Sequence, residues 1–461
     1  MKKLSFLPLL SICGAILFSC EPMDGLNKGN PNPTPAATIP TKAPDPTGSR
    51  QVVLYYPSYA RYGADFTAGD LLSKAGAGQD YEHDIFVPSF CVIGDGQTKI
   101  GSESSAWKKN EVAFDDIYAW GGLSWDSNGY LVFANGQSIG SGSIAEGLNK
   151  YPNIAYGLAI GGWPAQDNPN DPLRTAGFDR LGAIPNDLTA FVDNVDKLDE
   201  LKRITRVLNG IHIDYEFPLN TMQGGFLTKI CQALYAKVGT KNTINVAVGP
   251  NIDKHLAYLD FAALNNSVHK FEIMSYDYNG KWSNITGHHT NLFSAEASKL
   301  PANNANFSTN FSVDAEVTYM LSKGVPASKI KIGVALYGRF WTGVTFPTTI
   351  DPSKPYFTAT NSGLPSGVSS DDFLTEGIIK YNKILTEITP AKGWELFTDP
   401  TTGGAFAINR TLSMFVSYDS HASIMKKAAY VKSFGLGGVI VWDATGAKGT
   451  TILKQLSAAI K

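Results

Sequence analysis

The chain has 461 residues, with 39 Lys and Arg against 41 Asp and Glu, so its formal net charge is −2. Hydrophobic residues make up 43% and charged residues 17% of it, which is ordinary globular usage and excludes a disordered, collagen-like or coiled-coil protein. The balanced charge, without a basic stripe interleaved with aromatic residues, excludes a nucleic-acid partner. The length fits several domains or one decorated (β/α)8 barrel.

The N-terminal residues have the order of an export signal. Lys2 and Lys3 precede an apolar stretch, Leu4 to Phe18, that is too short for a permanent transmembrane helix. The sequence Leu17-Phe18-Ser19-Cys20 resembles a bacterial lipobox, in which cleavage precedes the cysteine and the cysteine carries lipid. We therefore expect residues 1–19 to be a signal peptide and Cys20 to anchor an exported lipoprotein to a membrane, on its periplasmic or cell-surface side. Ordinary secretory cleavage is the alternative.

Residues 20–48 are rich in Pro and Thr and contain almost no large apolar side chain. Such a stretch cannot bury a core, and its crowded prolines make it a stiff spacer. The folded part is expected to comprise residues 49–461. Its two cysteines, Cys91 and Cys231, are far apart in apolar stretches, so we expect small buried side chains and no metal site.

Eight short, β-rich apolar runs follow the spacer, separated by stretches with helical periodicity such as 225–238 and 421–434. The runs are Gln51–Pro57, Asp84–Cys91, Ile154–Ile160, Gly210–Glu216, Ile244–Gly249, Phe271–Asp277, Ile330–Tyr337 and Gly437–Trp442. Runs that are apolar on both faces and alternate with helices indicate parallel strands covered on both sides. Eight of them favour a closed (β/α)8 barrel over a doubly wound open sheet.

The segment between the seventh and eighth runs is too long for a simple crossover. It carries its own helical pattern around 376–388, so we predict a small α+β insertion domain at about 342–412. Because the loops after the strands form the active face of a barrel, this insertion is expected to build a wall of a substrate cleft.

The fourth run carries three side chains that can do chemistry. Side chains alternate along a strand, so His212, Asp214 and Glu216 share one face, which in a barrel is the interior. Buried carboxylates are costly unless they are paired, solvated or functional, and Glu216 falls where the strand reaches the active face. A catalytic site is the favoured interpretation, and a buried ion-pair network is the alternative.

The segment from Asn209 to Pro218 resembles strand four of glycoside hydrolase family 18, the chitinases and their relatives. The family pattern is Asp-x-x-Asp-x-Asp-x-Glu, and this chain has Asn209 and His212 at the first two acidic positions. Further matches recur in family order over roughly 400 residues, which makes the resemblance specific. They are Val52–Tyr59, Ile160–Trp163, Met274–Asp277, Ala335–Arg339, Phe415–Asp419 and Gly437–Trp442.

This resemblance implies a mechanism in which the 2-acetamido group of the substrate is the nucleophile. Glu216 would protonate the leaving oxygen, Asp214 would accept the N–H of the oxazolinium ion, and Tyr276 and Asp277 would hold the acetamido group. The expected substrate contacts are Trp442, Trp163, Arg339 and Tyr56. No cofactor is implied, and we expect a monomer.

The family's Asp at position 212 shares a proton with the Asp two residues on. His212 could hydrogen-bond Asp214 when neutral or hold it as a fixed ion pair when protonated, and either would slow catalysis. On this basis we expect His212→Asp to restore the shared proton and raise turnover. A purely structural His212 is the alternative.

The predicted function is hydrolysis of β-1,4-linked N-acetylglucosamine polymers by a lipid-anchored chitinase. Glu216 favours an enzyme, whereas His212 favours a glycan-binding lipoprotein with little turnover. An endo-β-N-acetylglucosaminidase is a third possibility.

Overall fold

The computed structural model describes residues 49–60, 66–73, 81–98, 108–114, 123–125, 131–133, 142–151, 155–163, 171–198, 208–239, 242–302, 304, 306–374 and 376–461. The expected signal peptide, Cys20 and the spacer lie outside these residues.

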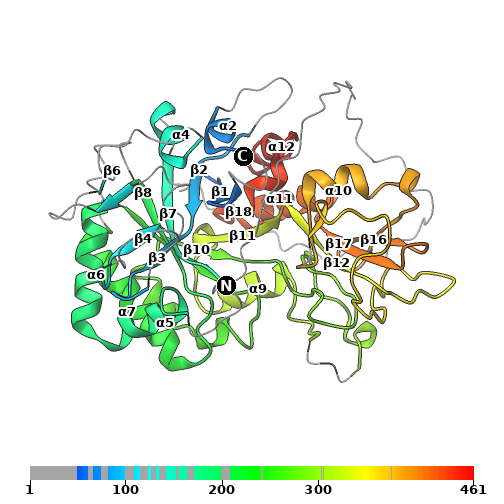
Figure 1. The fold of residues 1–461 in the computed structure, drawn as a ribbon. Helices are drawn as coiled ribbons and strands as arrows, with labels where there is room; N and C mark the ends of the chain where they lie inside the picture. Colours follow the sequence, from blue (N-terminus) through cyan, green and yellow to red (C-terminus); the bar gives the residue numbers. More distant parts are fainter. Residues whose placement is uncertain are drawn as a thin grey trace. The chain divides into compact units, whose positions relative to one another are not determined.

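Eight parallel strands form a closed ring (Figure 1). In ring order they are β1 (Gln51–Pro57), β2 (Ile85–Ser89), β7 (Ala155–Gly161), β8 (Leu208–Asp214), β9 (Thr243–Val248), β10 (Lys270–Ile273), β11 (Ile330–Ala335) and β18 (Gly438–Trp442). β2 pairs with β7 through Ile85 and Ala155, and β1 pairs with β18 through Gln51 and Gly438. These pairings leave the ring without an edge, so the predicted (β/α)8 barrel is confirmed and the open sheet is excluded.

Each of the eight predicted runs overlaps one barrel strand, and the ends of two strands differ from the prediction in a way that matters for the site. β8 ends at Asp214, so Glu216 lies two residues beyond the strand and is not its last residue. β10 ends at Ile273, and the chain turns through Met274 and Ser275 before Asp277. Both acidic residues therefore lie on loops at the carboxyl ends of strands, the position at which barrel enzymes carry their chemistry.

The strands separate two apolar cores because their side chains alternate between the two faces. One core packs strands against helices and contains Leu54, Ile211 and Ile213. The other fills the ring and includes Val53 and Tyr55. Residues 211–214 thus follow the predicted alternation, with the isoleucines facing helices and the polar residues facing the interior.

Helices follow most of the strands. They are α2 (Ala68–Leu72), α4 (Ile144–Lys150), α5 (Thr175–Ala183), α6 (Pro185–Leu198), α7 (Thr221–Val238), α8 (Phe261–Leu264), α9 (Val313–Ser322), α10 (Tyr381–Glu387), α11 (His421–Phe434) and α12 (Ile452–Ile460). α11 has the predicted bounds, and α7 begins four residues before the predicted 225–238 because Asn220 caps it by accepting from Gln223 N at 3.0 Å. None of the helices in the described part of the chain is long and apolar enough to span a bilayer.

A second sheet of six antiparallel strands lies between β11 and β18 in sequence. Its order is β13 (Phe373–Leu374), β14 (Ile378–Lys380), β12 (Tyr337–Trp341), β17 (Met414–Tyr418), β16 (Ala405–Asn409) and β15 (Glu395–Thr398). The segment predicted as an insertion at about 342–412 supplies β13 to β16 and α10. β12 and β17, on either side of that segment, belong to the same sheet and pair with each other.

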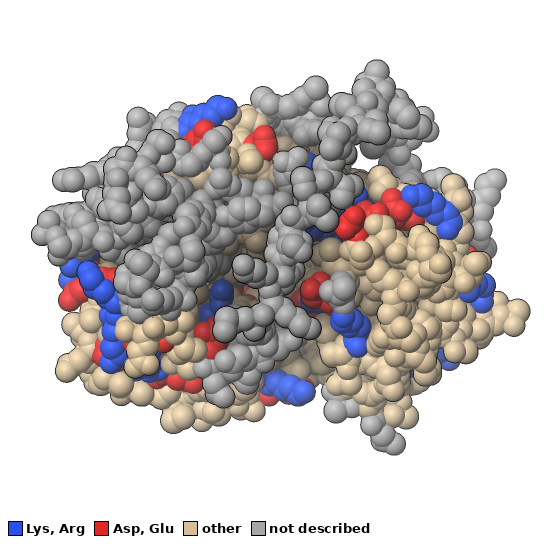
Figure 2. All heavy atoms as spheres, in the orientation of Figure 1, with Lys and Arg blue, Asp and Glu red and all other residues tan. Residues whose placement is uncertain are grey.

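Four short strands lie between β2 and β7 in the described part of the sequence. β3 (Cys91–Ile93) extends from β7, β4 (Val112–Phe114) pairs with β3, and β5 (Leu123–Trp125) pairs with β6 (Leu131–Phe133). Cys91 and Cys231 are both buried free thiols, as predicted. On the face seen in Figure 2, acidic and basic side chains of the described residues are interspersed.

Candidate active site

Glu216 and Asp214 lie at the carboxyl end of β8. Asp214 is 4% exposed, and its Oδ1 has no hydrogen-bond partner among the described residues. The backbone of this segment is fixed, because Asp214 O accepts from Gly162 N at 2.8 Å and Glu216 O accepts from Thr175 Oγ1 at 2.9 Å. The backbone that carries the two carboxyl groups is thus held in place, while Oδ1 of Asp214 stays available to a ligand.

The electrostatics of the site keep protons on these two groups. Burial and the neighbouring charges of Asp214 and Asp277 raise the pKa of Glu216 well above its ordinary value, against the opposing charge of Arg174. Burial and the charge of Glu272 raise the pKa of Asp214 to about 7, with Arg174 again opposing. Glu216 is therefore an acid that still carries its proton near neutral pH.

Tyr276 and Asp277 reach the same site from the loop after β10. Tyr276 is 7% exposed, and burial together with the charges of Asp214, Glu216 and Asp277 raises the pKa of its hydroxyl. Asp277 has a φ of 59°, in the left-handed region that Asp tolerates better than most residues. Arg339 on β12 donates two hydrogen bonds to the carboxylate of Asp277. Its Nε lies 2.6 Å from Oδ1, and its Nη2 lies 2.8 Å from Oδ2.

Asp277 is the charged carboxylate of the site. Burial opposes its ionisation, but the charge of Arg339 and the nearby loop residue His289 outweigh burial and hold the pKa of Asp277 well below its usual range. Burial lowers the pKa of His289 itself, so its neutral Nδ1 accepts the backbone N–H of Asp277 at 3.5 Å. A permanent negative charge at this point also favours the proton on Glu216.

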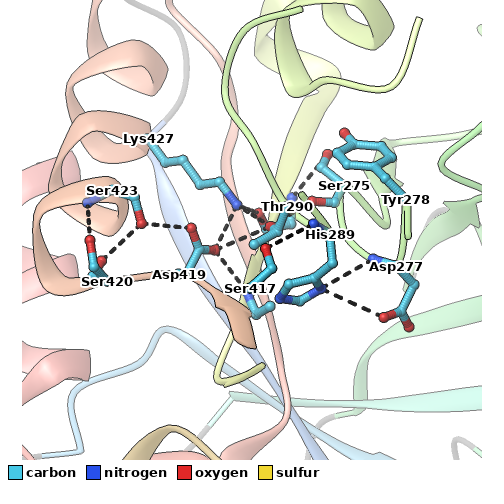
Figure 3. A network of polar contacts seen from close by, with 12 residues as sticks. Ser275, Asp277, Tyr278, His289, Thr290, Ser417, Asp419, Ser420, Ser423 and Lys427 are labelled. Atoms are coloured by element: carbon cyan, nitrogen blue, oxygen red, sulfur yellow. Dashed lines mark hydrogen bonds and ion pairs between the residues drawn. The ribbon is translucent and has the colours of Figure 1, made fainter. Parts of the chain in front are cut away.

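A buried polar network fixes the loop that carries His289 (Figure 3). His289 N donates to Ser417 Oγ on β17 at 3.1 Å. Its neighbour Thr290 accepts from Lys427 Nζ on α11 at 2.6 Å, and Lys427 Nζ also lies 2.7 Å from Asp419 Oδ2. These hydrogen bonds hold the backbone of His289 against β17 and the side chain of Thr290 against α11, which fixes the loop beside Asp277.

His212 faces the barrel interior, as predicted, but its hydrogen bonds do not go to Asp214. Nδ1 lies 2.8 Å from Glu272 Oε2 on β10 and 3.3 Å from the hydroxyl of Tyr55, and Nε2 lies 3.3 Å from Asn245 Nδ2 on β9. Within the described residues these are all of its polar contacts. The expectation that His212 pairs with Asp214 therefore gives way to a pair between His212 and Glu272.

Two of the predicted aromatic contacts lie at strand ends. Trp442, partly buried at the end of β18, stacks on Phe90 with ring centroids 5.6 Å apart and meets Tyr55 edge-on at 6.2 Å. Trp163 follows β7, is 54% exposed and lies 6.0 Å from the ring of Phe217. Exposed and half-exposed aromatic faces at this end of the barrel can stack on sugar rings.

Tyr56 does not lie with these residues. Its side chain is 1% exposed in the core between strands and helices, and its hydroxyl donates to Phe66 O at 2.7 Å. The alternation of β1 turns its neighbour Tyr55 inward instead, where the hydroxyl donates to Glu272 Oε2 at 2.7 Å. The substrate contact predicted for Tyr56 is therefore corrected: the tyrosine that reaches the interior is Tyr55.

Several residues of the site were missed from the sequence. Glu272 and Lys331 were placed in apolar strands, although a charged residue inside such a run, at the parity that faces the barrel interior, is itself a signal. His289 and Arg174 lie on long loops and carried no recognisable pattern. In the described part of the chain no group of three or more His, Cys, Asp or Glu side chains is arranged to hold a metal ion.

Comparison with known proteins shows the family to which the chain belongs. The sequence profile of Glycosyl hydrolases family 18 matches residues 51–447, and the chain belongs to this family. Chitinase A1 of Niallia circulans is 26% identical over 461 residues, covering 92% of this chain and 60% of that protein. A chitinase of Autographa californica nuclear polyhedrosis virus is 29% identical over 287 residues, covering 58% of this chain and 48% of that protein.

The chain thus spans only 48% to 60% of the length of these two relatives. Among solved structures, chitinase ChiA74 from Bacillus thuringiensis shares the fold with a TM-score of 0.69 at 17% identity, covering 89% of this chain and 70% of that one.

Proposed function

We propose that the chain hydrolyses β-1,4-linked N-acetylglucosamine polymers, the chemistry of a chitinase. The observation that carries the proposal is the pair of buried Asp214 and partly buried Glu216 at the carboxyl end of β8, both with raised pKa values and both near Tyr276 and Asp277. The names of the relatives in the same family support the choice of substrate.

Glu216 supplies the proton that the leaving sugar oxygen needs. Its partly buried site keeps it protonated near neutral pH, so it can act as a general acid. As the bond to the leaving oxygen breaks, Glu216 becomes a carboxylate, and the same group can then take a proton from the incoming water.

Asp214, Tyr276 and Asp277 supply the rest of a substrate-assisted reaction. The acetamido oxygen of the substrate attacks the anomeric carbon and a positively charged oxazolinium ion forms, whose N–H needs an acceptor. Asp214 has an unpartnered buried oxygen that can take this hydrogen bond. Tyr276 and Asp277, held from β10, β12 and the His289 loop, position the acetamido group for attack.

The test is turnover of chitin oligosaccharides by the parent and by Glu216→Gln. The variant should lower kcat by at least about 10²-fold while oligosaccharide affinity survives, because the amide keeps the shape but has no proton to give. Glu296→Gln is the matched control, since Glu296 is an exposed residue paired with Lys299 at 3.0 Å. Unchanged turnover in Glu216→Gln would remove Glu216 from the mechanism.

The same assay separates the other functions. A parent that binds chitin oligosaccharides but turns none over is a glycan-binding protein. A parent that cleaves N-glycan cores and leaves chitin oligosaccharides intact is an endo-β-N-acetylglucosaminidase. Retention of the β anomer in the first product, read by NMR, tests the participation of the acetamido group.

The site of action is part of the proposal. We propose that residues 1–19 direct export, that Cys20 carries lipid, and that residues 20–48 space the barrel from the membrane. Cys20→Ser should abolish labelling by a fatty-acid probe and partition into detergent, whereas Cys231→Ser should keep both. Equal labelling of parent and Cys20→Ser protein would contradict the anchor.

A further inference from the structure

A buried charged cluster fills the barrel interior next to Asp214. Glu272 and Lys331 are both 0% exposed and face each other across the β10–β11 pairing, with Lys331 Nζ 3.4 Å from Glu272 Oε1. The other oxygen, Oε2, meets the hydroxyl of Tyr55 at 2.7 Å and His212 Nδ1 at 2.8 Å. A carboxylate this deep in a barrel is tolerated only because every side of it has a partner.

These contacts fix Glu272 as an ionised, immobile group. Burial opposes its ionisation, but His212, Lys331 and the hydroxyl of Tyr55 outweigh burial and hold the pKa of Glu272 at about 2. The single hydroxyl hydrogen of Tyr55 is used on Glu272, and an ionised carboxylate can only accept. His212 Nδ1 must therefore carry a hydrogen and donate it to Glu272.

The strand register places Glu272 and Asp214 against the same residue of the strand between them. His212 on β8 pairs with Asn245 on β9, and Asn245 pairs with Lys270 on β10. Asp214 stands two residues beyond His212, and Glu272 stands two residues beyond Lys270, so both side chains face the interior and both correspond to Ala247 along the ladder. Ala247, the partner of Glu272 on β9, has only a small side chain.

We propose that Glu272 supplies from β10 the carboxylate that the family carries at position 212, and that it acts on Asp214 across the barrel interior while His212 holds it in place. Glu272 is thus a positioning residue for the reaction, and this assignment rests on the proposed hydrolase function. In this proposal two positions have changed together: His212 stands where the family has an Asp, and Glu272 on β10 supplies the carboxylate.

The space around His212 fits this exchange. A Cβ at Gly157 on β7 would lie 2.5 Å from Nε2 of the imidazole, and one at Gly210 would lie 3.2 Å from it. Two neighbouring positions without side chains leave room for a ring that reaches from β8 to β10, a span that the shorter Asp side chain does not cover. The imidazole of His212 therefore connects β8 to Glu272 on β10.

The other ionisable groups around Asp214 and Glu272 come from every side of the barrel. Asp214 is influenced by Glu272 and Arg174, and it in turn influences Tyr55, Glu216 and Tyr276. Glu272 faces His212, Lys331 and Tyr55. Of these groups Glu272 is the like charge that raises the pKa of Asp214, so its removal has a defined sign.

The experiment replaces Glu272 by Gln, which keeps the shape and removes the charge. Without that charge Asp214 ionises more readily, so the acidic limb of kcat/KM should move to lower pH by roughly one pH unit. The titration of Asp214, followed by 13C NMR of labelled Asp carboxyls and assigned with Asp214→Asn, should move in the same direction. The double variant Glu272→Gln/His212→Asp returns a carboxylate to position 212 and should bring both back toward the parent.

Glu316→Gln is the matched control. Glu316 on α9 is also 0% exposed, accepts from Tyr278 OH at 2.9 Å, and burial raises its pKa to about 8, so near neutral pH the substitution removes no charge. It should leave the titration of Asp214 in place. If Glu272→Gln fails to fold because Lys331 loses its partner, Glu272→Gln/Lys331→Met removes the buried pair together and carries the same expected shift.

The outcomes separate the two proposals. A lowered melting temperature with an unmoved Asp214 titration would make Glu272 purely structural and overturn the assignment. A shifted titration in a protein whose parent turns over no chitin would support Glu272 and overturn the proposed function instead. A shifted titration that the double variant fails to reverse would show that Glu272 does not substitute for an acid at position 212.

Discussion

Arg339 and Asp277 meet in a two-pronged ion pair, with Nε–Oδ1 and guanidinium–Oδ2 distances of 2.6 Å and 2.8 Å. The guanidinium also lies over the rings of Trp282 and Tyr337, 5.1 Å and 5.5 Å from their centroids. Asp277 is thus oriented by a group that is itself clamped. The sequence placed Arg339 as a contact of the substrate, whereas its closest partner in the structure is the carboxylate that is proposed to hold the acetamido group.

Arg339→Lys tests this clamp, because Lys keeps the charge but cannot make two parallel hydrogen bonds. We expect KM for chitin oligosaccharides to rise roughly tenfold, the effect of losing about 1.4 kcal/mol of positioning. Steady-state kinetics at neutral pH measure it. Arg410→Lys, in the exposed pair with Glu395 at 2.7 Å, should change neither KM nor kcat.

His212→Asp has opposite expected outcomes from the sequence and from the structure. By the motif alone it restores the family's acid and raises turnover. In the structure it removes the donor to Glu272 and brings a second carboxylate beside an ionised one, so we expect a loss of about 3 kcal/mol in the free energy of unfolding and lower turnover. Urea unfolding and kinetics measure both. A more active and equally stable variant would contradict the pairing of His212 with Glu272.

The fold was accessible from the sequence because each barrel strand is a short apolar run bounded by loops, and the pattern repeats eight times. Strand parity placed Asp214 in the barrel interior, whereas Glu216, Tyr276 and Asp277 lie on loops beyond the strand ends and were singled out by the family motifs. Tyr56 was misassigned because a motif names both tyrosines of β1, while only the alternation decides which one faces inward.

The charged interior was not accessible in the same way. Glu272 and Lys331 come from neighbouring strands, and only the pairing register brings their side chains together. The bond between His212 and Glu272 joins residues 60 positions apart. Partner choice in a barrel interior depends on such long-range pairings, and single-strand periodicity carries no information about them.

The raised pKa of Asp214 makes the stability of the fold depend on pH. Burial and Glu272 disfavour its charged form, so its folded-state pKa of about 7 exceeds its ordinary value of 3.8. A group shifted in this direction contributes stability below its unfolded pKa and loses it as pH rises toward the folded pKa. Asp214→Asn cannot ionise and is free of this loss.

The stability difference between Asp214→Asn and the parent should therefore grow in favour of the variant from pH 4 to pH 7, by up to about 1.4 kcal/mol per pH unit. Chemical unfolding at several pH values measures it. Asp193→Asn controls for the substitution itself, since Asp193 is an exposed partner of Lys237 at 2.7 Å. A difference that is flat with pH would show that Asp214 is not held protonated.

Two glycine substitutions test whether the position of the His212 imidazole matters for stability and turnover. One places an added methyl group against the ring, and the other places it in open space. Gly157→Ala would place its Cβ 2.5 Å from His212 Nε2 and 2.6 Å from Cδ2, closer than real atoms approach, so the imidazole must leave its contact with Glu272. We expect a loss of about 1–3 kcal/mol in the free energy of unfolding, as for an overpacked core, together with reduced turnover.

Gly225→Ala on α7 is the control. An added Cβ there meets nothing within 4 Å, so the variant should be more stable by about 0.5–1 kcal/mol with turnover unchanged, because Ala restricts the unfolded chain. Thermal unfolding and kinetics of the two variants give the comparison. If Gly157→Ala is as stable and as active as the parent, the imidazole has room to move, and its bond to Glu272 is not what holds the site.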